Sequence, residues 1–290
     1  MFLVSLPVCI SPLLLNYVNT TAQGDNQITR LSVSRLLPAL LYVPTAYLVF
    51  KYLGASSTKM ILLQWGVSTI VLLFVIISTR PSFKNLRPVF AELNRENRDY
   101  GFQLYLGSLV MVSTNYLAGI FIGHFNEDYS QVGYYTLALA ITSPLIMLPS
   151  IIGTTYFKQF ASEPKIPTRV MKFTLLLTIF SGILFVLVIK PFVVFLYSER
   201  YSIVGLYAST LAIGFCIHGL GDMLNRYLGS HGQGASIRNA SIANGVFKIL
   251  GYSVLVYFFN TMGAVITTIA CDIIYTTVLV LYYKRFIKSN

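Results

Sequence analysis

The sequence predicts an all-α integral membrane protein with about nine transmembrane helices. Hydrophobic residues make up 55% of the 290 residues and charged residues only 11%, whereas an ordinary soluble domain has about 25% charged residues. The mean hydropathy is +0.68, and the apolar residues form continuous runs. A soluble core of this size cannot hide so much apolar surface. These observations exclude a soluble enzyme, a nucleic-acid-binding module and a disordered chain. The chain is expected to be embedded in a lipid bilayer.

Nine apolar runs are candidate membrane-spanning helices, since a helix crosses the hydrocarbon with about 20 mostly apolar residues. In chain order they are 2–20, 36–53, 60–78, 103–123, 132–157, 172–189, 203–225, 240–258 and 262–283, and the sixth can extend to 197. The runs do not alternate apolar and polar residues, so a β-barrel is excluded.

The basic residues indicate the topology. Of the 21 Lys and Arg, Lys248 lies inside a run and 16 fall on the face of the C-terminus; the other four are Lys51, Lys59, Lys190 and Arg200. Cytoplasmic loops carry the excess of basic residues. We therefore expect a cytoplasmic C-terminus and, after nine crossings, an external N-terminus. The net charge of +11 then reflects topology and not nucleic-acid binding.

A polar linker at 79–102 divides the runs into three and six. Phe83, Leu86, Phe90 and Leu93 recur within it at helical spacing, among basic residues. This pattern is typical of an amphipathic helix on the cytoplasmic membrane surface. A plain basic loop is the alternative.

Two charged residues inside the runs are the leading site candidates, because ionisable groups in a bilayer are costly. Lys248 lies twelve residues before Asn260, where the last two helices turn, and Asp272 lies twelve after it. At a rise of 1.5 Å per residue both lie about 18 Å below the turn. Equal depth makes Lys248 and Asp272 a candidate ion pair that locks the hairpin. In the alternative, Lys248 faces a polar cavity and helps bind an anionic group.

Other polar residues offer weaker candidates. Asp222 and Arg226 are four residues apart and predict a local pair on one helix face. Arg35 begins the second helix and either snorkels or contacts a phosphate.

Amides inside membrane helices usually form hydrogen bonds across helix interfaces, and one or two can line a cavity. Asn115 and Asn244 are of this kind, and Asn244 shares a helix face with Lys248. His218 is interpreted as a satisfied interior histidine. The candidate substrate-binding residues are Lys248, Arg35, Asn115 and Asn244.

No enzyme, metal or cofactor site is expected. The sequence lacks a nucleophile elbow, a zinc-binding HExxH motif and a nucleotide-binding loop. The three cysteines and three histidines are scattered without metal-ligand spacing.

Four short features carry a resemblance to a known family. They are Arg98-Asp99-Tyr100-Gly101-Phe102, Val132-Gly133-Tyr134-Tyr135, Pro149 with Tyr156-Phe157, and Asn260 with Gly263-Ala264. In order and spacing they resemble the polysaccharide (O-antigen, Wzx-like) flippases of the multidrug/oligosaccharidyl-lipid/polysaccharide exporter superfamily.

The resemblance implies twelve helices in two six-helix lobes. The expected organisation here is then a partial N-terminal lobe of three helices at 1–78, the cytoplasmic linker at 79–102, and a complete C-terminal six-helix lobe at 103–290. The chain resembles a flippase lacking its first three helices.

The resemblance also implies a function in the bacterial cytoplasmic (inner) membrane. The transporter would flip an undecaprenyl-pyrophosphate-linked oligosaccharide, the repeat unit of O-antigen or another surface polysaccharide, from the inner to the outer leaflet. It would act beside a polysaccharide polymerase and chain-length machinery, with Lys248 and Arg35 holding the pyrophosphate and sugars.

Three alternatives remain open: a multidrug-type small-molecule exporter, an inactive remnant, and a membrane transferase of the same pathway. The transferase would need catalytic groups on an external loop, where His124, Glu127 and Asp128 are the nearest candidates.

Overall fold

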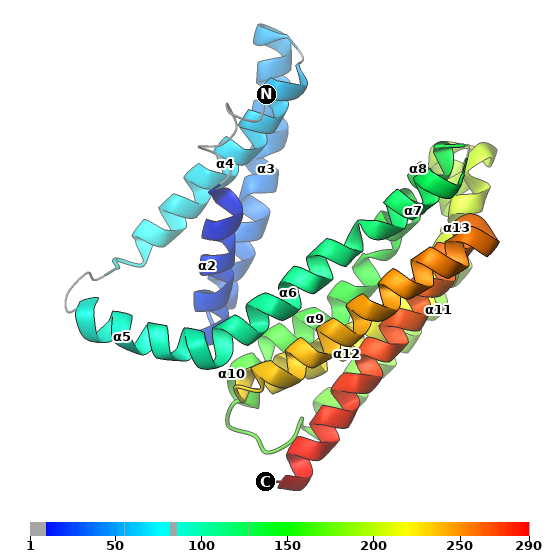
Figure 1. The fold of residues 1–290 in the computed structure, drawn as a ribbon. Coiled ribbons are helices and arrows are strands. Elements are labelled where there is room, and N and C mark those ends of the chain that lie inside the picture. Colours follow the sequence, from blue (N-terminus) through cyan, green and yellow to red (C-terminus); the bar gives the residue numbers. More distant parts are fainter. Residues whose placement is uncertain (1–9, 55, 82–85, 127, 290) are drawn as a thin grey trace. The chain divides into compact units, whose positions relative to one another are not determined.

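The described part of the protein consists almost entirely of helices, most of them apolar. The structure, a computed structural model, describes residues 10–54, 56–81, 86–126 and 128–289 (Figure 1). Nearly all of these residues are helical and none lies in a strand. Seven helical segments of the described chain are long and apolar enough to cross a membrane. The predicted all-α membrane class is confirmed, and the chain is a multi-pass membrane protein.

The chain divides into two compact units, one ending at Val89 and the other beginning at Phe90. This boundary falls inside the polar stretch at 79–102. The second unit holds the polar residues on which the functional argument depends, so it is described at greater length.

The first unit contains three helices, α2 (Ser11–Gly24), α3 (Ile28–Leu53) and α4 (Ser57–Ser78). Val18 of α2 packs with Leu72 and its neighbours on α4 in a small hydrophobic cluster. Helix α3 starts eight residues before the predicted run. The run was defined by apolar residues, whereas the helix also includes two more polar turns before them. Residues 11–20 of the run predicted at 2–20 lie in α2, and residues 2–9 are outside the described part.

The predicted amphipathic helix forms as α5 (Leu86–Glu96) and continues into a π-helical turn at Asn97–Gly101. Its apolar side chains are exposed in the isolated chain, with Phe90 at 67% and Leu93 at 60%. Phe83 lies outside the described residues. Location of α5 on the cytoplasmic membrane surface stays a prediction.

The second unit continues through eight α-helices and a short 3-10 turn. They are α6 (Phe102–Asn115), α7 (Leu117–Phe125), α8 (Ser130–Thr142), α9 (Pro144–Thr155), α10 (Phe157–Phe160), α11 (Thr168–Tyr197), η3 (Glu199–Tyr201), α12 (Ser202–Ser230) and α13 (Gly234–Ser289). Two predicted spans are interrupted, as α6/α7 and as α8/α9. The second interruption falls at Ser143, directly before Pro144. Ser143 keeps helical dihedrals, with φ −53° and ψ −31°, but Pro144 has no N–H to donate to the preceding turn.

Helix α12 lies at the centre of the second unit and packs against α8, α9, α11 and α13. Small residues allow this close packing. A side chain at Gly219 would meet Pro149 of α9 at 2.9 Å, and one at Gly214 would meet the Ile269 backbone of α13 at 3.0 Å.

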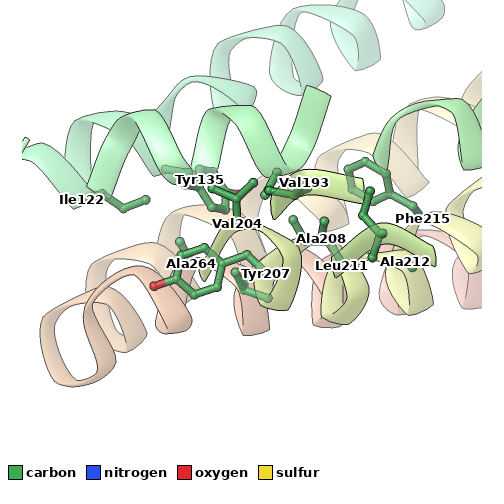
Figure 2. Packing of buried hydrophobic residues seen from close by; sticks show 14 of the residues in the cluster. Ile122, Tyr135, Val193, Val204, Tyr207, Ala208, Leu211, Ala212, Phe215 and Ala264 are labelled. Carbon is green, nitrogen blue, oxygen red and sulfur yellow. The ribbon is translucent and has the colours of Figure 1, made fainter. Parts of the chain in front are cut away.

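Two hydrophobic clusters fill the interior of the second unit. The first cluster includes Ala118, Ile122, Tyr135, Val204, Leu211, Phe215, Tyr252, Val256 and Val265. Figure 2 shows part of it, with side chains from α7, α8, α11, α12 and α13 converging. The second cluster includes Phe160, Met223, Leu224, Tyr227, Leu228, Ile237, Ala240, Tyr275 and Leu279. Apolar side chains also lie on the outer surface of α11, where the exposed fraction is 67% for Phe180 and 86% for Phe195. Such a surface is suited to contact with lipid.

Helix α13 consists of two limbs that meet at a sharp turn. Asn260 breaks the helix with φ 51° and ψ −137°, at the predicted turn between the last two runs. Gly263 follows it so tightly that a Cβ there would overlap the Leu255 backbone carbonyl. The tight turn lays the two limbs against each other, which brings Lys248 and Asp272 to comparable positions along the hairpin.

We predict that Gly263→Ala destabilises the protein by about 1–3 kcal/mol, because the neighbouring atoms are backbone and cannot move aside cheaply. Gly133→Ala in α8 is the matched control, since nothing lies within 4 Å of its Cβ position. That change should be neutral or stabilise by up to about 1 kcal/mol. The free energy of unfolding in mixed micelles checks both, and equal effects would contradict the description of the turn.

Candidate functional site

Polar side chains gather in a layer between the two hydrophobic clusters of the second unit. We call this the polar layer and define it as Asn115, His218, Asp222, Asn244, Lys248 and Asp272. On α12, His218 and Asp222 follow Phe215 of the first cluster and precede Met223 of the second. The layer therefore lies midway along α12.

The same order holds on α13. Along its first limb the chain passes from Ala240 of the second cluster, through Asn244 and Lys248, to Tyr252 of the first. Its second limb passes back from Val265 of the first cluster, through Asp272, to Tyr275 of the second. Both limbs thus carry their charged residue at one level, where an apolar bundle has no solvent to stabilise it.

Lys248 makes its hydrogen bond to an amide and not to a carboxylate. Its side chain is 7% exposed, and its Nζ donates to Asn115 Oδ1 at 2.9 Å. Asn115 itself is exposed at the end of α6. The ammonium group therefore points from the interior toward a polar spot on the surface of the second unit.

The predicted ion pair between Lys248 and Asp272 is not formed in this structure. Asp272 Oδ1 is instead hydrogen-bonded to His218 Nδ1 at 2.8 Å. Equal depth brought the two charges to one level, but the rotation of each limb turns Lys248 toward α6 and Asp272 toward α12.

Asp222 also pairs with His218, and the predicted pair between Asp222 and Arg226 is not among the salt bridges of the described residues. The Asp222 Oδ1 lies 3.8 Å from His218 Nε2. The imidazole therefore lies between two carboxylates, one on its own helix and one on α13. His218 also stacks on Tyr275, with ring centroids 4.8 Å apart.

Asn244 is buried at 1% exposure, and neither its amide nitrogen nor its oxygen has a hydrogen-bond partner among the described residues. The same is true of Asp272 Oδ2. Unpaired buried polar atoms cost about 1–3 kcal/mol each. Such atoms are unusual in native structures and are often found where a ligand or water binds.

Arg35 lies in the first unit, where it is exposed and its Nε donates to Asn19 Oδ1 at 3.3 Å. It lines a cavity of about 540 Å³ between α2, α3 and α4, together with Gln64 and Ser68. Arg35 and the polar layer are thus features of separate units.

The contacts of His218 with two carboxylates were not predicted from the sequence. The expectation of a satisfied interior histidine holds for Nδ1, which is hydrogen-bonded to Asp272, but it leaves out the two carboxylate neighbours of the ring. One signal was available: Asp222 lies four residues after His218, and such residues are neighbours on a helix surface. The contact with Asp272 depends on helix rotation, which the sequence does not reveal.

In the loop before α8, the Asp128 carboxylate accepts a hydrogen bond from the backbone. The Ser130 backbone N–H donates to Asp128 Oδ1 at 2.9 Å, and this hydrogen bond lowers the pKa of the Asp128 carboxyl. Glu127 lies outside the described residues. Among the described His, Cys, Asp and Glu side chains, no group of three or more could hold a metal ion.

Comparison of the chain with known protein families, with curated proteins and with solved structures finds no match.

We predict that double-mutant cycles separate the observed pairs from the sequence-based pairing. His218–Asp272 and Lys248–Asn115 should each show a coupling energy of about 0.6–1.7 kcal/mol, between the mean and the maximum measured for interhelical hydrogen bonds in membranes. The cycle for Lys248 and Asp272 should give a smaller value, because those two groups share no hydrogen bond. Alanine substitutions and unfolding in mixed micelles provide the measurement, and the largest coupling between Lys248 and Asp272 would contradict the structure.

Proposed function

We propose that the chain is a membrane transporter that flips an undecaprenyl-pyrophosphate-linked oligosaccharide between the leaflets of the bacterial cytoplasmic membrane. One observation carries this proposal. Lys248 is a buried cation in the polar layer, and the hydrogen bond that it makes among the described residues goes to a neutral amide. Its charge is therefore available to an anionic group.

The contacts of Lys248 are better explained by binding of a pyrophosphate than by a purely structural role. An ammonium group has three donors, and Asn115 uses one of them. A structural lysine in an apolar bundle would be expected to pair with a carboxylate, because an unpaired buried charge is strongly destabilising. Ionisable residues inside membrane segments commonly mark substrate pathways.

The exposure of Asn115 supports a cavity at this level. A polar amide in contact with lipid tails would lose its hydrogen bonds to water. An exposed Asn115 beside a lysine is explained if the surface around it faces an aqueous cavity. A negatively charged headgroup in such a cavity would contact Asn115 and Lys248 together.

An apolar groove between α11 and α12 supports a lipid component of the substrate. It has a volume of about 420 Å³ and no charged residue lines it; Ile179, Gly182 and Ile213 are among its walls. A groove of this chemistry accommodates an isoprenoid or acyl chain, while the headgroup needs a polar site elsewhere.

Binding of undecaprenyl pyrophosphate to the full chain in nanodiscs tests the proposal, with uncharged undecaprenol as the reference lipid. We predict that Lys248→Gln weakens binding of the pyrophosphate by about ten- to a hundredfold, because charge-assisted hydrogen bonds contribute about 1.5–3 kcal/mol. Lys248→Arg should retain most of the binding. Lys172→Gln, which removes an exposed cation at the start of α11, is the control.

A second variant separates binding from a merely structural role of Lys248. Asn115→Asp gives the lysine a carboxylate partner, so the fold should be kept or stabilised while pyrophosphate binding falls. Unchanged binding in both Lys248→Gln and Asn115→Asp would overturn the proposal. Tight binding of organic cations without binding of the pyrophosphate would favour a multidrug-type exporter.

A further inference from the structure

The polar layer contains a second arrangement that the proposed substrate does not use. The His218 imidazole lies between Asp272, 2.8 Å from Nδ1, and Asp222, 3.8 Å from Nε2. An ionised carboxylate can only accept hydrogen bonds, so Nδ1 carries a proton and donates it to Asp272. Nε2 is left as the free basic nitrogen, and a carboxylate faces it beyond hydrogen-bond distance.

We propose that His218 is a proton-binding site within the membrane span of the second unit. One proton from water adds to the Nε2 lone pair, a new N–H bond forms there, and no bond within the protein breaks. The product is an imidazolium between two carboxylates, and release of the same proton restores the neutral ring. This site does not depend on the identity of the transported substrate.

The two carboxylates make the charged form of His218 tolerable inside the bundle. Histidine is the side chain whose ordinary titration lies nearest to neutral pH, and burial alone would disfavour its charged form. A carboxylate at each nitrogen opposes that effect, because opposite charges at this range favour ionisation. Asp272 Oδ2 has no hydrogen-bond partner among the described residues. The hydrogen bond of this carboxylate is therefore the one between its Oδ1 and His218.

The other charged groups around His218 are few. On α13, Lys248 opposes protonation through space and Tyr275 stacks on the ring. Helices α8 and α9 contain no charged residue. The other elements packed against α12 are α10, α11 and η3, and their charged residues lie away from the middle of α12. These residues are Lys158, Arg169, Lys172, Lys190, Glu199 and Arg200.

The exposure of the three side chains indicates how a proton reaches the site. Asp222 is 25% exposed, His218 12% and Asp272 only 5%. The most exposed carboxylate thus faces Nε2, and the most buried one holds Nδ1. Proton exchange through the Asp222 side follows from this gradient. Uptake of one proton adds one positive charge to the layer that contains Lys248.

The small number of histidines allows a direct measurement. The chain has three, so His124→Gln with His231→Gln leaves His218 as the single imidazole. We expect ¹⁵N NMR of this variant, histidine-labelled and in nanodiscs, to show Nε2 gaining a proton between pH 9 and pH 5. Nδ1 should stay protonated throughout. A native unfolding profile of the variant confirms its fold.

Two carboxylate variants test the arrangement. Asp272→Asn should lower the proton affinity of His218 by at least about tenfold, the equivalent of one lost charge-assisted hydrogen bond. Asp222→Asn should lower it by a smaller factor, and Asp99→Asn, in the exposed linker, should leave it unchanged. A His218 that keeps one protonation state from pH 5 to pH 9, or ignores both carboxylates, would overturn the proposal. Titration of His218 without pyrophosphate binding would overturn only the proposed substrate.

Discussion

Hydrocarbon offers no hydrogen-bond partners, so each polar group inside a membrane bundle must find its partner within the protein or in a cavity. In the second unit this constraint gathers Asn115, His218, Asp222, Asn244, Lys248 and Asp272 into one layer between two apolar clusters. The small residues of α12 allow α13 to approach closely enough for His218 to contact Asp272. The tight turn at Asn260 sets the level at which the two limbs of α13 present their charges. The layer is therefore a product of the packing around it.

The layer separates its charges into two groups. On one side Lys248 contacts Asn115 of α6, which is exposed. On the other side His218 of α12 lies between Asp222 and Asp272. A direct bond between Lys248 and Asp272 would have cancelled both charges and left no site. Because each charge has a different partner, one side is available to an anion and the other to a proton.

Composition and run length were sufficient to predict the fold class, because the bilayer imposes both. The nine runs correspond to helices in the described chain, with breaks at Tyr116 and Ser143 that hydropathy does not register. The turn between the last two runs was predicted at Asn260, where the backbone has left-handed φ.

Pairing inside the layer could not be predicted in the same way. Residue counting gives depth along a helix, and it placed Lys248 and Asp272 at one level. The partner of each group depends on the rotation of the helix about its axis. Helix α13 is apolar on most sides, so its hydrophobic pattern does not specify this rotation. Arg35, which was grouped with Lys248 as a substrate contact, lies in the first unit, and its role as a substrate contact stays a prediction.

The proposed function requires that the polar layer opens to an aqueous cavity at Asn115. Asn115→Cys in a chain whose three cysteines are replaced by serine tests this claim, with Ile179→Cys in the apolar groove as the lipid-facing control. A membrane-impermeant, negatively charged methanethiosulfonate should modify position 115 and not position 179, and undecaprenyl pyrophosphate should protect position 115. Modification of position 115 only by a lipid-soluble maleimide would contradict the account, because Asn115 would then face lipid.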